Sequence, residues 1–317
     1  MKSAATTKDL QVGQRTFLQR LGRDMQRNYS LYLLVIPVIL FYVLFHYKPM
    51  YGLIIAFKRF NPSLGILGSP WVGLANFKQF FGGFHFARVL RNTLIISFSN
   101  LIFSFPAAII LALLLSEIKS KIFAKTVQTI TYMPHFISLV VVCGMVVDFV
   151  SYDGVINKIT ALFGMEPVAF LQNPGAFVPI YVISGIWQEV GWSSIIYLAA
   201  ITGINSELYE AATIDGAGRF RQVFAVTLPG IAPTIVIMLL LSIGNIMSLG
   251  YEKIILLYNP MIYETSDIIS SYVYREGLEN FNFGLSTAVG LFNSVINFIL
   301  VIGANKLSRV IGDTSLW

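Results

Sequence analysis

Long apolar stretches alternate with shorter polar ones along most of this chain. Each long stretch has about 18 residues or more, the length that a helix needs to cross a hydrocarbon core of about 30 Å. Six such stretches cover residues 29–47, 93–115, 129–150, 177–200, 233–250 and 285–305. The pattern predicts an all-α, polytopic membrane protein with six transmembrane helices. Gly244, Asn245 and Gly250 dilute the fifth stretch, so its end is less well defined than its existence.

The composition agrees with this prediction. Hydrophobic residues make up 56% of the chain and charged residues 12%, and the mean hydropathy is +0.71. An ordinary soluble domain has about 25% charged residues. The first apolar stretch lacks a small-residue cleavage site after it, so we expect a retained helix rather than a signal peptide. Residues 1–28 are interpreted as a polar leader, and residues 29–317 as one membrane domain.

Basic residues indicate the orientation, because an excess of Lys and Arg marks the cytoplasmic side of a membrane protein. With the leader inside, the cytoplasmic segments hold 13 basic residues in 86 positions, and the outer segments hold 9 in 105. Both termini and the segment 201–232 are therefore expected in the cytoplasm. The six basic residues of the leader are Lys2, Lys8, Arg15, Arg20, Arg23 and Arg27.

The remaining composition excludes several functions. The net charge of +6 is explained by the excess of Lys and Arg in the predicted cytoplasmic segments. No basic cluster is interleaved with aromatic residues, so nucleic acid is not an expected partner. Cys143 is the single cysteine, and His46, His85 and His135 fall in different segments, so we expect no metal site. The histidines are interpreted as interfacial or helix-packing residues.

Motifs of catalysis are also missing from the chain. It contains no Gly-x-x-x-x-Gly-Lys-[Ser/Thr] phosphate loop, no Gly-x-Ser-x-Gly elbow and no His-Glu-x-x-His. We therefore expect no catalytic residues, no enzymatic activity and no cofactor bound by this chain itself.

The polar segment 203–230 has the signals of a short, capped helix. Asn205 can cap its start, Glu207 lies in the first turn near the positive end of the helix dipole, and Gly216 can end it in a left-handed conformation. A helix, a Gly break and a second short helix are predicted. Ala211 and Ala212 are small, and leave a flank against which another protein can pack closely. Carboxylates at Glu210 and Asp215 lie beside that flank.

This segment resembles the EAA loop of ABC-importer permeases, where the cytoplasmic ATPase docks. The residues at the positions of that pattern are Glu210, Ala211, Ala212, Ile214, Asp215, Gly216, Ala217, Phe220, Phe224, Leu228 and Pro229. The resemblance assigns ATPase coupling to Glu207, Glu210, Ala211, Ala212, Asp215, Gly216 and Ala217. One departure is Asn205-Ser206 in place of Asp-Pro, but Asn also caps a helix. Without the full pattern, an amphipathic loop with ordinary caps would be the alternative.

Further stretches extend the resemblance over nearly the whole chain. They include residues 51–58, 71–77, 91–94, 132–136, 185–192 and the final Ser-Leu-Trp. These stretches are similar to permeases that import oligosaccharides and polysaccharide fragments, including alginate. The resemblance implies a type I importer in a bacterial cytoplasmic membrane, with a second permease, two copies of an ATPase that uses ATP, and an extracytoplasmic sugar-binding protein.

Polar residues inside the spans are candidates for a substrate path, because they usually face a bundle interior or a water-filled cavity. They are Asn100, Gln188, Glu189, Asn245, Asn293 and Asn297. Aromatic rings beside hydrogen-bonding groups suit sugars, and Asn293 and Asn297 share a helix face. The candidates taken forward are Trp187, Glu189, Trp192, Asn245, Asn293 and Asn297. The alternative is that the Asn residues bond neighbouring helices and the tryptophans anchor near an interface.

Two other classes of protein remain as alternatives. A six-helix secondary transporter or channel would need buried ionisable residues, for which the spans offer Glu189 and Asp148. An integral membrane enzyme would need a catalytic constellation, which the chain does not contain. Dependence of uptake on ATP and on a co-expressed ATPase separates the permease from both.

Overall fold

The computed structural model describes residues 25–247 and 249–311. Helices of several kinds form nearly all of the regular structure in these residues, beside one isolated antiparallel bridge between Lys58 and Trp71. Most of the basic leader, residues 1–24, lies outside the described residues, as does the C-terminal Ser-Leu-Trp.

The chain divides into two units, residues 1–54 and residues 55–317. In the first unit, α2 (Tyr29–Tyr42), the π-helical turn η1 (Val43–Tyr47) and α3 (Lys48–Met50) follow one another as the helix that the first apolar stretch predicts. Apolar side chains surround α2 on all sides, as expected of a helix in contact with lipid.

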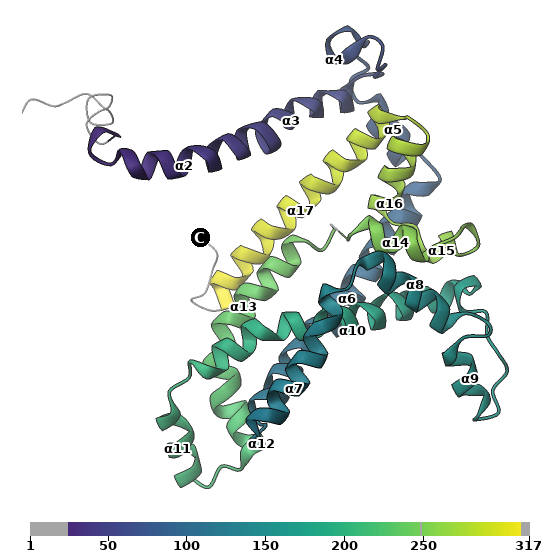
Figure 1. Ribbon diagram of the computed structural model, residues 1–317. Coiled ribbons are helices and arrows are strands. Elements are labelled where there is room, and N and C mark those ends of the chain that lie inside the picture. Colours follow the sequence, from purple (N-terminus) through teal and green to yellow (C-terminus); the bar gives the residue numbers. More distant parts are fainter. Residues whose placement is uncertain (1–24, 248, 312–317) are drawn as a thin grey trace, which may run out of the picture. The chain divides into compact units, whose positions relative to one another are not determined.

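In the second unit, the long helices are α6 (His85–Ser116), α8 (Leu139–Val150), α10 (Pro174–Thr202), α13 (Leu228–Gly244) and α17 (Phe283–Ile311) (Figure 1). Five helical stretches in the described residues are long and apolar enough to cross a membrane. They are Tyr29–Phe57, His85–Ser116, Leu139–Ala161, Arg219–Gly244 and Phe283–Lys306. The remaining predicted span, 177–200, corresponds to α10. Its 29 residues are also long enough to cross a membrane, but its polar residues lower its mean hydropathy.

Two of the predicted spans differ from the structure. The stretch 129–150 is not one helix: α7 (Lys121–Tyr132) ends in the 3₁₀ turn η3 (Met133–Phe136), and α8 begins at Leu139. Pro134 weakens the helix here, since proline has no N–H for the helix ladder, and the chain leaves helical geometry at Ile137 and Ser138, whose ψ angles are 136° and 137°.

The fifth span starts earlier than predicted. Helix α12 (Arg219–Gln222), the π-helical turn η5 (Val223–Thr227) and α13 form one helical stretch that ends at Gly244 rather than near Gly250. Asn245 therefore caps the end of α13 instead of lying inside the span.

Helices α6 and α10 pack along each other, and α13 packs against α17. Buried side chains from α6, α8, α10 and α14 (Tyr251–Leu257) form one core cluster, whose members include Ile96, Phe177 and Ile254. The shorter elements of this unit are η2 (Tyr51–Phe57, shared with the first unit), α4 (Gly65–Gly68), α5 (Ala75–Phe81), α9 (Val155–Ala161), η4 (Phe170–Gln172), α11 (Ser206–Ile214), η6 (Pro260–Ile262), α15 (Tyr263–Ser266), α16 (Ile269–Tyr274) and η7 (Arg275–Glu279).

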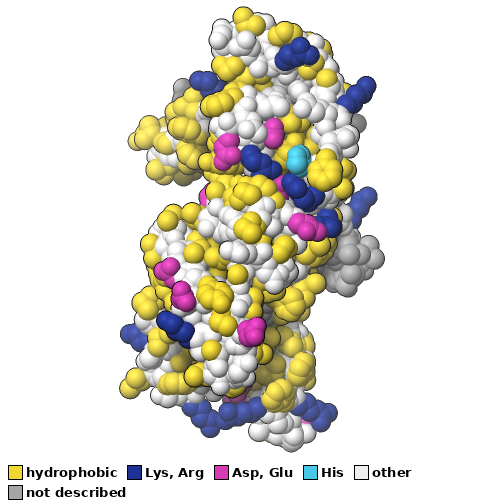
Figure 2. Space-filling model, turned by 90° about the vertical axis from the view of Figure 1, so that its right-hand side faces the viewer, with side chains coloured by type: hydrophobic (Ala, Val, Ile, Leu, Met, Phe, Trp, Pro, Cys, Tyr) yellow, Lys and Arg dark blue, Asp and Glu magenta, His cyan; other side chains and the backbone are white. Residues whose placement is uncertain are grey.

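Apolar side chains are spread over the face of the molecule in Figure 2, as lipid contact requires, while dark blue Lys and Arg side chains gather along its lower end. Helices α11 and α12 occupy that lower end in Figure 1. The segment 117–125, which includes the start of α7, contains the basic residues Lys119, Lys121 and Lys125, and α12 contains Arg219 and Arg221.

Candidate functional site

Helix α11 begins as the sequence predicts. The side-chain oxygen of Asn205 accepts a hydrogen bond from the backbone N–H of Glu207 at 3.0 Å, and its amide donates to the Glu207 carboxylate at 3.0 Å. Asn205 thus satisfies a donor that the first helical turn leaves free. The predicted cap is confirmed.

The end of α11 is a glycine turn. Gly216 has a φ of +75°, a left-handed conformation that costs side-chain-bearing residues about 1–2 kcal/mol. The N–H of Gly216 donates to the carbonyl of Thr213, and the N–H of Ala217 donates to the carbonyl of Ala212 at 2.8 Å. The predicted Gly break is confirmed as well.

Two contacts brace α11 against the helical stretch that follows it. The Gln222 amide donates to the Thr213 hydroxyl at 2.9 Å and to the Ala217 carbonyl at 3.0 Å. The hydroxyls of Tyr209 and Thr227 are hydrogen-bonded at 3.0 Å. Because that stretch runs without interruption into α13, the predicted second short helix is the beginning of the helical stretch Arg219–Gly244.

We call residues 205–227, which form α11, the glycine turn and the helical turns that brace α11, the hook. The outer surface of the hook combines carboxylates with exposed apolar side chains. Ile214 is 87% exposed and Phe220 is 83% exposed, although both lie in a polar segment. Apolar side chains exposed in this way are available for contact with another protein or with lipid. Glu207, Glu210, Ala211, Asp215 and Gly216 are also exposed, while Ala212 and Ala217 are half-buried.

A second group of candidates lies on α10. Tyr181, Gly185, Glu189, Ser193 and Tyr197 recur every four residues and so share one face of the helix, which we call the α10 stripe. The four-residue spacing of these polar and small residues can be read from the sequence, so it could have been used to find this face of α10.

Glu189 and Trp192 are brought together by residues of the turn after α7. The Glu189 carboxylate is 2.8 Å from Nδ1 of His135, and the His135 ring stacks on Trp192 with centroids 4.5 Å apart and planes 3° apart. Phe136 meets Trp192 edge-on at 5.6 Å. The side chains of Glu189 and His135 are 48% and 29% exposed, so the group is open on one side.

His135 was missed as a site residue because the sequence places it 54 positions from Glu189. The contact depends on a close approach of α7 and α10 at Gly191. A Cβ added to Gly191 would lie 2.1 Å from the carbonyl oxygen of Thr131, so only glycine allows this approach.

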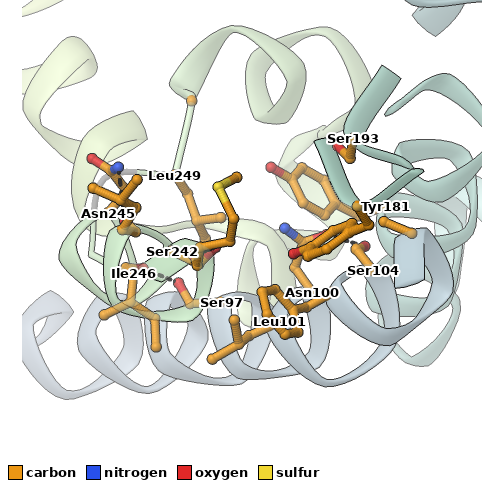
Figure 3. A pocket seen from close by; sticks show the side chains of 16 residues that line it. Ser97, Asn100, Leu101, Ser104, Tyr181, Ser193, Ser242, Asn245, Ile246 and Leu249 are labelled. Carbon is orange, nitrogen blue, oxygen red and sulfur yellow. Dashed lines mark hydrogen bonds between the residues drawn. The ribbon is translucent and has the colours of Figure 1, made fainter. Parts of the chain in front are cut away.

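Beside the stripe, a pocket of about 540 Å³ lies between α6, α10, α13 and the turn after α13 (Figure 3). Its volume falls in the range of about 300–1,000 Å³ that is usual for small-molecule sites. The polar residues that line it include Asn100, Ser104, Tyr181, Ser193, Ser242 and Asn245. Asn245 is thus a pocket residue, although it lies beyond the end of α13.

The other candidates lie elsewhere. Trp187 lines a separate apolar recess of about 590 Å³ beside α8 and α9, away from Glu189 and Trp192. Asn293 and Asn297 share a face, as predicted, but both bind the backbone of Met247, through its carbonyl at 3.0 Å and its N–H at 3.1 Å respectively. The geometry of the two asparagines fits helix packing, since they hold the turn after α13 in place.

The described residues contain no group of three or more His, Cys, Asp and Glu side chains that could hold a metal ion. The candidate site consists of the exposed surface of α11, an aromatic and charged group at Glu189, and a polar pocket between helices.

Comparison with known proteins defines the class. Residues 104–311 match the family described as "Binding-protein-dependent transport system inner membrane component", and the chain belongs to this family. It is a multi-pass membrane permease of an ABC transporter, and not an enzyme. The membership confirms the resemblance that the motif at 203–230 indicates.

Individual relatives are similar over most of their length. The chain is 45% identical to the polygalacturonan/rhamnogalacturonan transport system permease protein YteP of Bacillus subtilis (strain 168), over 92% of this chain and 91% of that protein. It is 42% identical to Protein LplB of the same organism, over 92% of each chain. A crystal structure of a bacterial alginate ABC transporter in complex with alginate pentasaccharide-bound periplasmic protein contains a chain with 44% identity and a TM-score of 0.87, covering 94% of this chain and 100% of that one.

Proposed function

We propose that this chain is one of two permease subunits of an importer that moves oligosaccharides or polysaccharide fragments, delivered by an extracytoplasmic binding protein, into the cell. The relatives named for polygalacturonan, rhamnogalacturonan and alginate support saccharides as the substrate class. ATP is hydrolysed by two copies of a partner ATPase, since this chain carries no phosphate loop.

The observation that carries the proposal is the braced, capped helix α11 with exposed apolar residues. In the proposed mechanism the ATPase grips α11 through Ala211, Ile214 and the carboxylate of Glu210. Closure of the ATPase pair then moves α11, and the helical stretch from Arg219 to Gly244 transmits the movement to the path. A rigid element is needed for this, and the contacts of Gln222 and Tyr209 supply the rigidity.

The path itself is proposed to follow Glu189, Trp192 and Asn245, with His135 and Phe136 completing the aromatic group. Sugar rings present C–H faces to aromatic side chains and hydroxyls to carboxylates and amides. For Asn293 and Asn297 we propose the positioning of Met247, and for Trp187 contact with lipid or a neighbouring subunit.

Both termini and α11 are proposed to lie in the cytoplasm, on the basis of the excess of basic residues. A cysteine at Ser3 should resist an impermeant thiol reagent added to intact cells, whereas a cysteine at Glu166 in an outer segment should react. The native Cys143 is buried and gives a low background. Labelling at Ser3 would reverse the topology.

The docking of the ATPase is tested by Glu210→Lys and Ala211→Trp. Loss of a charge-assisted contact costs about 1.5–3 kcal/mol, so co-purification of the ATPase should fall at least tenfold. Glu166→Lys makes the same charge change at an exposed outer position and should leave co-purification unchanged. Full ATPase binding and transport by both α11 variants would remove the main support for this assignment.

A further inference from the structure

Lys253 is a buried cation without a carboxylate partner. Its residue is 8% exposed, on the short helix α14. The ammonium donates a hydrogen bond to the carbonyl of Tyr181 at 3.0 Å and lies 4.7 Å from the centroid of the Tyr181 ring. Among the described residues, no carboxylate oxygen is within ion-pair distance of this ammonium.

Burial of this ammonium without an ion-pair partner lowers the stability of the protein, which suggests that the charge serves a function. Taking an ammonium out of water is strongly unfavourable, and buried charges are normally paired. One carbonyl and one aromatic face compensate for only part of the lost hydration. Within membrane proteins, a retained charge of this kind commonly faces a cavity through which a solute or ion passes.

The position of the ammonium relates it to the pocket beside the α10 stripe. A Cβ added to Gly185 would lie 3.2 Å from the Lys253 Nζ and 3.9 Å from the side-chain oxygen of Asn100. Gly185 therefore lets the ammonium pack closely against α10, near the side chain of Asn100. Asn100 and Tyr181 both line the pocket (Figure 3), and the ammonium contacts Tyr181, so the charge lies next to the pocket wall.

The acidic residue one turn further along the stripe, Glu189, makes no direct ion pair with this ammonium. Its carboxylate lies 2.8 Å from Nδ1 of His135. The pocket thus has hydroxyls and amides along its wall and one positive charge next to that wall. Neutral sugars need only the hydrogen-bonding wall.

We propose that Lys253 makes the pocket selective for saccharides that carry carboxylates, that is, uronate-containing oligosaccharides. The ammonium provides a fixed positive potential next to the wall of the pocket, and this potential favours a sugar that carries carboxylates over a neutral one. The inference rests on the proposed function, in which saccharides pass through this chain. It adds a residue that determines specificity within the path.

The test compares two probes of the same length, an oligogalacturonate and its methyl ester, in which the carboxylates are neutralised. Uptake is measured with the complete transporter, including its binding protein, for wild type, Lys253→Met and Lys253→Arg. We expect Lys253→Met to reduce uptake of the charged probe at least tenfold while uptake of the ester changes less than twofold. Lys253→Arg should retain most of the uptake of the charged probe.

Controls separate this role from folding and from the proposed function. Lys158→Met removes an exposed outer charge and should change neither probe. Basal ATPase activity of the complex reports correct assembly of each variant. An equal loss of both probes in Lys253→Met, or unchanged uptake of both, overturns the selectivity while leaving the saccharide importer in place. Uptake of neither probe by wild type overturns the saccharide assignment and the selectivity together.

Discussion

The hook at α11 and the segment 251–284 are both built from short helices, but they are held together in opposite ways. The hook is braced by neutral hydrogen bonds between residues no more than 18 positions apart, with one exposed ion pair between Arg219 and Glu117 at 3.6 Å, and its carboxylates stay exposed. The segment 251–284 uses the fully buried Asp267, whose partner Arg88 is 179 positions away. The carboxylates of the hook are thus available to a partner, whereas Asp267 is bound within the protein.

In the segment 251–284, Asp267 is the centre of a group of charged side chains that also includes Arg275 and, from α6, Arg88. Its carboxylate accepts hydrogen bonds from Arg275 at 2.8 and 3.1 Å, from Arg88 at 3.0 Å and from the Ser271 hydroxyl at 2.9 Å. Burial lowers the pKa of Arg275, but the hydrogen bond and charge of Asp267 raise it more, so the net pKa lies above its ordinary value. The Arg275 guanidinium therefore stays protonated at every physiological pH.

The largest effect on stability is expected for Asp267→Ala. The change leaves two arginines without their buried partner, and breaking a buried pair costs about 3–5 kcal/mol. We expect a marked fall in the melting temperature of the purified permease and a low yield. Glu279→Ala removes an exposed carboxylate from the same segment and should melt like wild type. Equal melting of the two variants would contradict the contrast between the segments.

An intermediate effect is expected for Gly191→Ala, at the crossing of α7 and α10. The new Cβ would lie 2.1 Å from a backbone oxygen, which cannot move without shifting α7, and overpacking of this kind costs about 1–3 kcal/mol. The contact of His135 with Glu189 should be lost with it. Gly144→Ala, also inside a helix but with nothing within 4 Å of its Cβ, should retain stability and uptake. Thermal melting and uptake of both variants check the prediction.

Sequence and structure agree where interactions are local. The cap at Asn205 and the turn at Gly216 are properties of neighbouring residues, so the pattern predicts them. The pairs His135 with Glu189 and Arg88 with Asp267 depend on which helices cross, and hydropathy holds no information on crossings. For the same reason Lys253 looks in the sequence like an ordinary charge of an outer segment.

A smaller effect, on uptake alone, is expected for Trp192→Ala. The ring stacks on His135 in the proposed path, and loss of a stacking contact worth about 0.5–1.5 kcal/mol corresponds to about a two- to tenfold fall in uptake. Trp187→Ala is the matched control, because it removes the same side chain from the same helix but from the apolar recess. Uptake by the two variants, at equal amounts of assembled complex, gives the comparison. An equal fall in both would favour packing for Trp192.

The smallest effect is expected at the cap of the hook, for Asn205→Ala. An N-cap is worth about 0.5–2 kcal/mol, and the lower end of that range applies here because Gln222 and Tyr209 also hold α11 in place. The permease should insert and melt normally, while coupling falls, seen as more ATP hydrolysed for each sugar imported. Asn205→Asp keeps a capping oxygen and should restore tight coupling. If Asn205→Ala instead lowers the melting temperature as much as Asp267→Ala does, the hook is part of the stable core, and a locally built handle for the ATPase is the wrong description.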